Sequence, residues 1–159
     1  MQTLIAYTTR HGTTLRYCLA LARELAGEVT LVDLRDEPAI DISLFDTVIL
    51  GGAVYAGRVA KELREFCSAN KEALAQKRLG FFVCGWHEGE AAQEQLEAAF
   101  PHELLSIAAA RACFGGEMNL AEMSLFERLI VKVVAKVQEN ASRYSDEAVR
   151  EFARALRES

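Results

Sequence analysis

The chain has 159 residues, of which 51% are hydrophobic and 26% are charged, and its formal net charge at pH 7 is −5. This composition excludes collagen-like, disulfide-rich and disordered proteins, and the length suits one domain with a single buried core over residues 1–159. No block of lysine or arginine stands out in this acidic chain, which argues against a nucleic-acid partner. The N-terminal residues lack the basic and apolar regions of a signal peptide, so we expect a cytoplasmic protein.

The first part of the chain predicts two strands with a helix between them. Residues 3–8 are apolar and are followed by hydroxyl and glycine signals, as expected for a buried strand. The next apolar residues recur at helical spacing until Gly27 ends the helix; they are Leu15, Cys18, Leu19, Ala22 and Leu25. Residues 29–34 predict a second strand, and residues 35–43 a loop or a short, poorly formed helix.

The middle of the chain repeats this alternation. The predicted strands are residues 47–50 and 79–84, and the predicted helices are residues 59–74 and 89–100. The alanines of residues 104–114 suit a helix as well as a strand, and their place in the alternation favours a fifth strand. Strands that are apolar throughout and separated by helices indicate a parallel sheet covered on both faces. The predicted fold class is therefore α/β with three layers.

The C-terminal part predicts two further helices. Residues 146–157 form an amphipathic helix that Ser145 can cap. Residues 125–137 are apolar well beyond one stripe, with Lys132 and Lys136 one turn apart on the remaining side. Such a helix must bury its surface against the domain or a second subunit, as in a homodimer, or against a membrane. Packing against protein is the alternative that we favour.

Cysteine and glutamate residues give weaker signals. The cysteines are far apart and form no CxxC pair, so we interpret them as small core residues without a metal or redox role; they are Cys18, Cys67, Cys84 and Cys113. A series of glutamates forms either a solvated helix face or a surface that steers a basic partner; these are Glu88, Glu90, Glu94, Glu97 and Glu103.

The loop after the first strand, read YTTRHGTT from Tyr7 to Thr14, combines several hydroxyl groups with a glycine. A loop that opens a helix directs backbone N–H groups and the positive end of the helix dipole to one point, which favours an anion such as phosphate. The chain has neither GxxxxGK(S/T) nor GxGxxG, so a monophosphate fits better than a triphosphate or a dinucleotide. The alternative is that threonine and glycine only cap the helix.

Two more glycine-rich segments follow predicted strands, at residues 51–58 and 85–89. In an open parallel sheet, ligands bind beyond the carboxyl ends of the strands, where the strand order reverses. Tyr55 and Trp86 lie in these segments, and aromatic rings on either side are what a flat heteroaromatic ligand needs for stacking. Each ring taken alone is more commonly a packing residue, but their shared edge favours a binding role.

These motifs make the chain resemble flavodoxin-fold FMN proteins. Thr9-x-x-Gly12-x-Thr14 resembles the flavodoxin phosphate loop. Gly51-x-x-x-Tyr55-x-Gly57 resembles the first flavin-ring loop of the short flavodoxin-domain family that includes menaquinone-dependent protoporphyrinogen oxidase. Residues 124–137 resemble an extra helix of that family. The resemblance implies a five-stranded sheet in the order 2-1-3-4-5, an extra C-terminal helix and FMN as the cofactor.

The resemblance also implies which residues bind FMN. Those of the phosphate cradle are Thr9, Arg10, His11, Gly12, Thr13 and Thr14. Those around the flavin ring are Ala53, Val54, Tyr55, Ala56 and Gly57 on one loop and Gly85, Trp86 and His87 on the next. No acid–base pair, nucleophile or metal-ligand pattern stands out, so we assign no catalytic residue and no metal.

An FMN protein of this kind exchanges electrons, because the redox chemistry belongs to the cofactor. We expect an electron carrier or a small flavin oxidoreductase, with a redox partner protein or a quinone-type acceptor. One alternative is an enzyme like protoporphyrinogen oxidase that uses a quinone. The other is a flavin-free interaction module, because the same fold hosts many functions.

Overall fold

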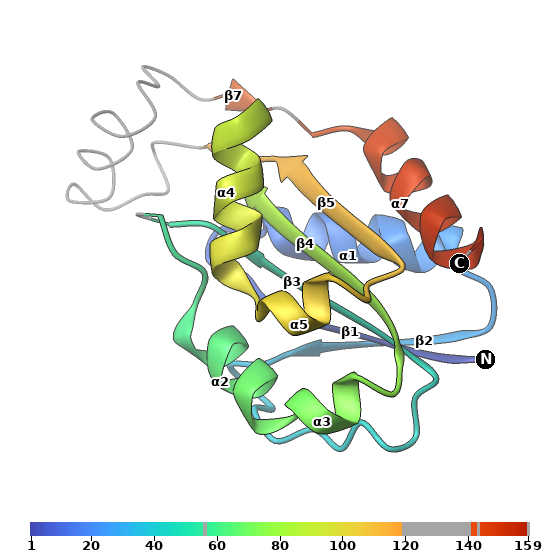
Figure 1. The fold of residues 1–159 in the computed structure, drawn as a ribbon. Helices are drawn as coiled ribbons and strands as arrows, with labels where there is room; N and C mark the ends of the chain where they lie inside the picture. Colours follow the sequence, from blue (N-terminus) through green and yellow to red (C-terminus); the bar gives the residue numbers. More distant parts are fainter. Residues whose placement is uncertain (56, 119–140, 143, 159) are drawn as a thin grey trace.

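The structure is a computed structural model that describes residues 1–55, 57–118, 141–142 and 144–158. Its centre is a parallel sheet in the order β2-β1-β3-β4-β5, which confirms the predicted order (Figure 1). The strands are β1 (Gln2–Thr8), β2 (Glu28–Asp33), β3 (Thr47–Ala53), β4 (Arg78–Gly85) and β5 (Ala110–Gly115). Two short strands, β6 (Glu117–Met118) and β7 (Ala141–Ser142), form a separate antiparallel pair.

The register of the sheet aligns the carboxyl ends of its three central strands. Thr8 at the end of β1 pairs with Gly52 in β3, and Gly52 pairs with Val83 in β4. Gly51 and Gly52 therefore continue β3, whereas both were predicted to follow the strand. A Cβ on Gly51 would overlap the Phe82 ring of the neighbouring strand, so a glycine is needed at this point of close packing.

Helices cover both faces of the sheet, which confirms the predicted three-layer α/β arrangement (Figure 1). One face carries α1 (Thr13–Glu24) and α7 (Asp146–Glu158). The other carries α2 (Lys61–Ala69), α3 (Lys71–Leu74), α4 (Gly89–Ala99) and α5 (His102–Leu105). Helix α7 is a predicted helix, and the Ala148 N–H donates to Ser145 Oγ at 3.1 Å as its expected cap. The other predicted C-terminal helix, at residues 125–137, lies outside the described residues.

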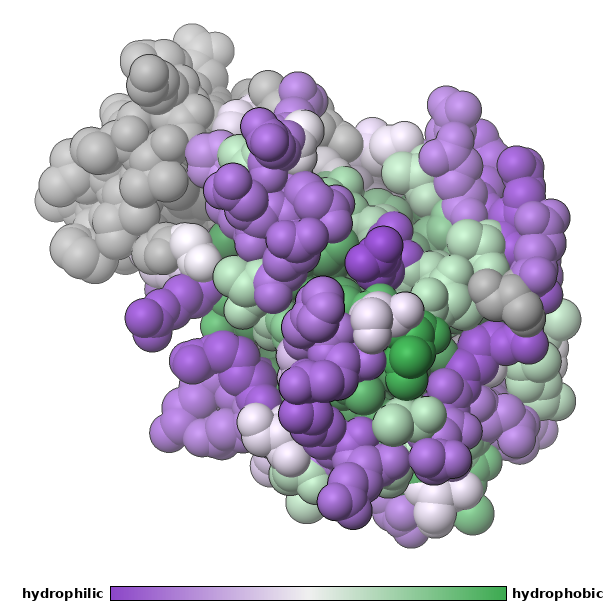
Figure 2. Space-filling model, in the orientation of Figure 1, coloured by the Kyte–Doolittle hydropathy of each residue, from purple (hydrophilic) through white to green (hydrophobic). Residues whose placement is uncertain are grey.

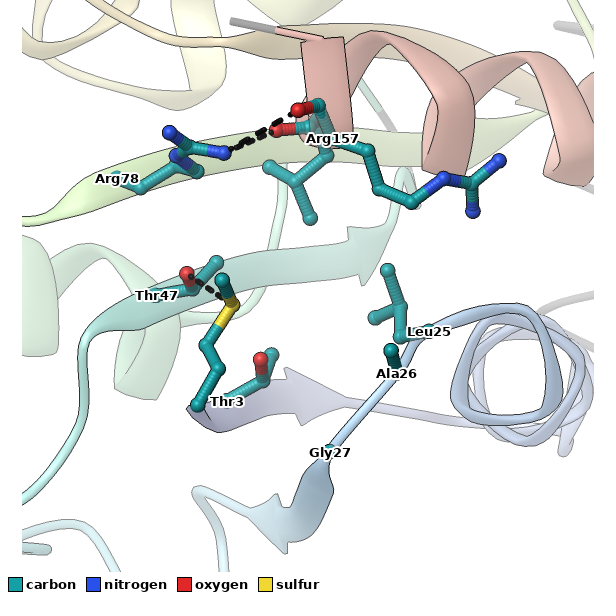
Figure 3. Close-up of a pocket in the computed structure, with 9 residues that line it drawn as sticks. Thr3, Leu25, Ala26, Gly27, Thr47, Arg78 and Arg157 are labelled. Atoms are coloured by element: carbon teal, nitrogen blue, oxygen red, sulfur yellow. Dashed lines mark hydrogen bonds between the residues drawn. The ribbon is translucent and has the colours of Figure 1, made fainter.

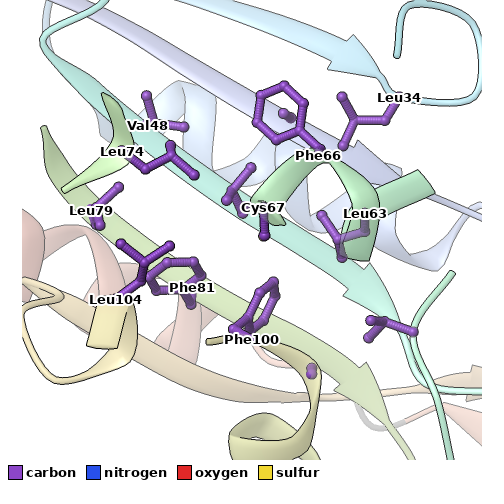
Figure 4. Packing of buried hydrophobic residues seen from close by; sticks show 14 of the residues in the cluster. Leu34, Val48, Leu63, Phe66, Cys67, Leu74, Leu79, Phe81, Phe100 and Leu104 are labelled. Atoms are coloured by element: carbon purple, nitrogen blue, oxygen red, sulfur yellow. The ribbon is translucent and has the colours of Figure 1, made fainter. Parts of the chain in front are cut away.

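The sheet separates two apolar clusters, because side chains alternate between its faces along each strand. Leu4 belongs to the cluster on the side of α2 to α5, and its neighbour Ile5 to the cluster on the side of α1 and α7. Figure 4 shows the first cluster, in which the Phe81 and Phe100 ring centroids are 4.7 Å apart. The central strands therefore read as continuous apolar runs, although each residue faces a single layer.

Helix α1 is rotated relative to the face that the sequence spacing predicts. Leu19 is 46% exposed, whereas Tyr17 is fully buried. The Tyr17 ring stacks on Phe114 with centroids 4.4 Å apart. The Tyr17 hydroxyl donates to the Gly115 carbonyl oxygen at 2.8 Å and accepts the Ser145 N–H at 3.3 Å. A tyrosine can be buried here because its hydroxyl is paired, which a count of apolar residues does not reveal.

Two predicted elements have different boundaries in the structure. The helix predicted at residues 59–74 is divided into α2 and α3 at Asn70, whose Nδ2 donates to the Phe66 carbonyl oxygen at 3.0 Å. The strand predicted from residue 104 is wrong for its first residues, which belong to α5 because their N–H groups donate to the Pro101 carbonyl oxygen. Strand β5 begins only at Ala110.

The surface and the cysteines agree with an ordinary packed core. Cys18, Cys67 and Cys84 are buried, Cys113 is half-buried, and all four are free thiols, which confirms them as core residues. The face with α2 to α5 is mostly hydrophilic, with hydrophobic side chains in a smaller central area (Figure 2). All five glutamates of the series noted in the sequence are exposed; they are Glu88, Glu90, Glu94, Glu97 and Glu103. Among the described helices, none has the length and apolar character to cross a membrane.

Candidate functional site

Three loops leave the sheet side by side at the carboxyl ends of β1, β3 and β4. The Val54 N–H donates to the Cys84 carbonyl oxygen at 2.8 Å and ties the loop after β3 to β4. The Gly116 N–H donates to the Gly85 carbonyl oxygen at 2.8 Å and fixes the end of β4. The chain leaves β1 toward β2 on one side and enters β3 on the other, so this edge is the point where the strand order reverses.

The loop after β1 leads directly into α1. Gly12 is the N-cap residue, and its φ of 89° lies in the left-handed region that favours glycine. The Gly12 N–H donates to Thr9 Oγ1 at 3.0 Å and closes the turn. Among the described residues, no side chain forms a capping hydrogen bond at this end of α1, so the loop threonines do not act as helix caps. The N–H groups of the first turn and the positive end of the helix dipole therefore remain for an anion.

Thr14 lies in the first turn of α1 and is fully buried. Its Oγ1 is also buried and has no hydrogen-bond partner within the part of the chain that the structure describes. A buried hydroxyl without a partner costs about 1–3 kcal/mol. The Thr14 hydroxyl therefore fits a ligand oxygen that accepts its hydrogen beside the N-terminus of α1.

The loop after β3 makes a tight turn from Tyr55 to Arg58. The Tyr55 N–H donates to the Arg58 carbonyl oxygen at 2.8 Å, and the Arg58 N–H donates to the Tyr55 carbonyl oxygen at 3.1 Å. Gly57 within this turn has a φ of 80°, which a residue with a Cβ adopts only at an energetic cost. Ala56, another predicted site residue, lies outside the described residues.

A cleft of about 130 Å³ opens between these two loops and the end of β2. The residues that line it are Thr8, Thr9, Arg10, Arg35, Ala53, Tyr55, Arg58, Val59 and Ala60. The Arg10 guanidinium carbon lies 4.1 Å from the centroid of the Tyr55 ring. Tyr55 Oη is buried without a hydrogen-bond partner among the described residues. We call this feature the arginine cleft, because three arginines line it.

The arginine cleft unites only some of the predicted site residues. Those that line it are Thr9, Arg10, Ala53 and Tyr55, whereas residues 11–14 and 85–87 do not. Trp86 and His87 are half-buried on the loop after β4. The predicted residues therefore lie on three neighbouring loops, of which the first two meet at the cleft.

Arg35 and Arg58 line the cleft but were not predicted as site residues. Arg35 follows β2, and its N–H donates to Asp33 Oδ1 at 2.9 Å. Arg58 closes the turn after β3. The available signal was that each arginine stands just beyond the carboxyl end of a strand, which is the edge where open parallel sheets bind ligands.

A second cavity, of about 240 Å³, lies at the opposite, amino end of the sheet (Figure 3). Thr3 of β1, Thr47 of β3 and Leu25 after α1 line it. Arg78 lines it too, and its Nη1 donates to the Leu156 carbonyl oxygen at 3.0 Å. This arginine therefore serves the C-terminal end of α7, where cations satisfy the last carbonyl groups of a helix.

The described residues include no candidate metal centre, and two of their buried thiols have raised pKa values. No group of three or more His, Cys, Asp and Glu side chains among them is placed to hold a metal ion. Burial raises the pKa of the Cys67 thiol to about 12. Burial, with the Cys84 thiol as a smaller contribution, raises the pKa of Cys18 well above its ordinary value. Both thiols are therefore protonated near neutral pH and are poor nucleophiles.

Comparison with solved structures finds flavodoxins that align along almost the whole chain. Flavodoxin 2 of Bacillus cereus is 21% identical, with a TM-score of 0.63 and 99% of each chain covered. The flavodoxin of Streptococcus pneumoniae TIGR4 is 16% identical, with a TM-score of 0.57 and the same coverage. Rubredoxin oxygen:oxidoreductase of Desulfovibrio gigas is 15% identical, with a TM-score of 0.57, and the match covers 99% of this chain and 36% of that one. These similarities show the flavodoxin-like fold.

Comparison of sequences gives the family. No curated protein sequence matches the chain significantly. A family model described as "Flavodoxin domain" matches residues 4–145, which include all three loops at the carboxyl edge. FMN is the cofactor that this match implies, and the unpaired Thr14 hydroxyl at the uncapped N-terminus of α1 fits a phosphate. The chain belongs to the flavodoxin-domain family.

Proposed function

We propose that the chain is a single-domain FMN-dependent redox protein, which acts as an electron carrier or a small flavin oxidoreductase. The observation that carries the proposal is the buried Thr14 hydroxyl, which lacks a partner at the N-terminus of α1. An anion accepts such a hydrogen readily, and the helix dipole favours its negative charge. The family implies FMN, whose phosphate supplies that anion.

In this proposal the first loop holds the phosphate. The residues involved are Thr9, Arg10, His11, Gly12, Thr13 and Thr14. Gly12 opens the backbone, because its left-handed φ turns the chain into α1 and a glycine leaves room for the ligand. Thr9 stabilises this turn by accepting the Gly12 N–H. The Thr14 hydroxyl and the N–H groups of the first helical turn then bind the phosphate oxygens.

The flavin ring lies between the loops after β3 and β4. The residues that we assign to it are Ala53, Val54, Tyr55, Ala56, Gly57, Gly85, Trp86 and His87. Bound FMN supplies one-electron and two-electron transfer. Tyr55 and Trp86 cover the faces of the ring and keep water away from them, and both are half-buried, as suits residues that cover a ligand at an edge. The hydrogen bond from Val54 to Cys84 fixes the spacing of the two loops.

Replacement of Thr14 by valine tests the proposal. Valine keeps the shape of threonine and removes the hydroxyl, so we expect the Kd for FMN to rise about tenfold or more. Binding of riboflavin, which has no phosphate, is expected to change little. Quenching of flavin fluorescence on titration measures both affinities, and the absorbance spectrum shows whether the protein as purified is yellow. Thr30→Val is the matched control, because Thr30 is exposed on the edge strand β2.

Two results would contradict the proposal. A folded protein that remains colourless and binds no added FMN would favour a flavin-free interaction module. Equal loss of FMN and riboflavin affinity in Thr14→Val would mean that the hydroxyl acts on the fold and not on the phosphate.

An enzyme that passes electrons from a porphyrinogen to a quinone is a narrower form of the proposal. Its support is the similarity of the segment from Gly51 to Gly57 to the flavin-ring loop of menaquinone-dependent protoporphyrinogen oxidase. A redox partner protein is the alternative acceptor. Reoxidation of the reduced, FMN-loaded protein by a water-soluble quinone distinguishes the two. A cytoplasmic location and a homodimer belong to the same proposal, and residues 125–137, on which membrane contact depends, lie outside the described residues.

A further inference from the structure

The arginine cleft adjoins the proposed FMN site and shares Thr9, Arg10, Ala53 and Tyr55 with it, whereas Arg35 and Arg58 belong to the cleft alone. Its lining comes from the ends of β1, β2 and β3 and from the residues before α2, and excludes residues 11–14 and 85–87. Arg35 and Arg58 have no assigned contact with FMN, and Arg10 lies over the Tyr55 ring, with its guanidinium carbon 4.1 Å from the ring centroid. The separation of the two sites therefore rests on the proposed function.

The charge in the cleft is opposite to that of the chain. The chain carries a formal net charge of −5, whereas the described residues that line the cleft include Arg10, Arg35 and Arg58 and no Asp or Glu. The Arg35 and Arg58 side chains form no ion pair with any described residue. The like charges of Arg35 and Arg58 at one concave surface repel each other and attract an anion.

The cleft also offers hydrogen-bond donors that have no partner. Ala60 lines it as the N-cap of α2, a nine-residue helix without a side-chain cap, so the positive end of this helix faces the same space. Tyr55 lines the cleft, and its Oη is buried and lacks a hydrogen-bond partner in the described chain. Guanidinium groups bind carboxylates and phosphates through paired N–H groups. All of these groups suit an oxyanion.

We propose that the arginine cleft is a second anion site, which binds the carboxylate or phosphate group of a small molecule while FMN occupies its own site. Arg35 and Arg58 bind the oxyanion from two sides, and Tyr55 donates its phenol hydrogen to it. Arg10 contacts both the anion and the Tyr55 ring, so it links the second site to the residue that covers the flavin. The volume of about 130 Å³ suits the anionic group and leaves the remainder of the ligand outside.

Isothermal titration of the FMN-saturated 159-residue chain with malonate and with inorganic phosphate tests the proposal. Saturation with FMN occupies the phosphate loop, so a second anion must use another site. We expect binding of one anion per chain, and the stronger of the two probes identifies a carboxylate or a phosphate ligand. Arg35→Gln and Arg58→Gln should each raise the Kd about tenfold or more, because each removes a charged hydrogen-bond donor. Low ionic strength is needed, because salt screens exposed charges.

Control variants distinguish an effect on the cleft from an effect on folding or on FMN binding. Arg154→Gln, on the exposed side of α7, should bind the anion as the wild-type protein does. Both cleft variants should keep the wild-type Kd for FMN, which also shows that they are folded. If FMN does not bind at all, the titration is made without it. Anion binding that survives Thr14→Val and is lost in Arg58→Gln would then support the second anion site, although the proposed FMN function would have failed.

Three results would overturn the second anion site. The first is the absence of binding by either anion. The second is wild-type anion affinity in both Arg35→Gln and Arg58→Gln. The third is anion binding that FMN abolishes, because the anion would then occupy the phosphate loop.

Discussion

The two ends of the sheet use arginine in different ways. At the amino end, Arg78 donates to the Leu156 carbonyl oxygen, and Arg157 Nη1 donates to the Glu24 carbonyl oxygen at 2.9 Å. Both guanidinium groups therefore satisfy the last turns of helices. At the carboxyl end, Arg35 and Arg58 line a cleft, and their side chains form no hydrogen bond with the described residues. The same residue type serves the fold at one end and is available to a ligand at the other.

The comparison also shows that size does not identify a binding site. The cavity at the amino end, of about 240 Å³, is larger than the arginine cleft of about 130 Å³. Its arginines are engaged by helix ends, whereas the smaller cleft contains polar groups without partners, which a binding site needs. We therefore expect changes at the amino end to lower stability and changes at the carboxyl end to lower ligand affinity.

Leu156→Ala should give the largest effect on stability. Leu156 is 3% exposed, lines the amino-end cavity and belongs to the cluster beneath α1 and α7. Its truncation enlarges a cavity, so the free energy of unfolding should fall by about 2–5 kcal/mol, with an unchanged Kd for FMN. Urea denaturation followed by circular dichroism measures the loss. Leu44→Ala is the control, because Leu44 is 76% exposed. Weaker FMN binding by folded Leu156→Ala would contradict the expectation that changes at the amino end affect stability and not ligand affinity.

Arg78→Met sharpens the comparison of the arginines. Methionine keeps the apolar stem and removes the charged donor to α7, so we expect the free energy of unfolding to fall by about 1.5–3 kcal/mol. The matched change at the carboxyl end, Arg35→Met, should alter it by less than about 0.5 kcal/mol. The same urea experiment compares both variants. Equal losses of unfolding free energy in the two variants would mean that Arg35 also stabilises the fold. Arg35 would then not be available to bind an anion in the cleft.

Most of the fold was predictable because burial on both faces of the sheet produces a simple sequence pattern. Val48, Ile49 and Leu50 are all buried although they alternate between two layers, so a parallel strand appears as a continuous apolar run. Where hydrogen bonds and not apolar burial set the end of an element, the predicted boundary was wrong. The break at Asn70 depends on a side-chain hydrogen bond to the backbone, and apolar spacing contains no record of such a bond.

The site residues were predictable where they lie in one continuous loop, and less predictable where they come from several loops. The segment from Thr9 to Thr14 is continuous, so its glycine and hydroxyl groups indicate an anion site without any tertiary information. Arg35 and Arg58 are each unremarkable in sequence, and only the strand order brings them to one cleft with Arg10. Tyr17 shows the same limit in the core, because its burial depends on a hydrogen bond to Gly115, which is distant in sequence.

Gly57→Ala should cost less stability than Leu156→Ala or Arg78→Met, and it applies the comparison to a single turn. A Cβ at Gly57 would meet no atom within 4 Å, so the change creates no clash, and its cost comes from the φ of 80° alone. That cost is about 1 kcal/mol, and we expect the Kd for FMN to rise several-fold because the turn carries Tyr55. Gly57→Asn should recover most of the affinity, since asparagine tolerates the left-handed region better than alanine. Flavin fluorescence titration of both variants measures this difference. If alanine and asparagine weaken FMN equally, backbone conformation is not the cause, and the turn must need the absence of a side chain to admit the ligand.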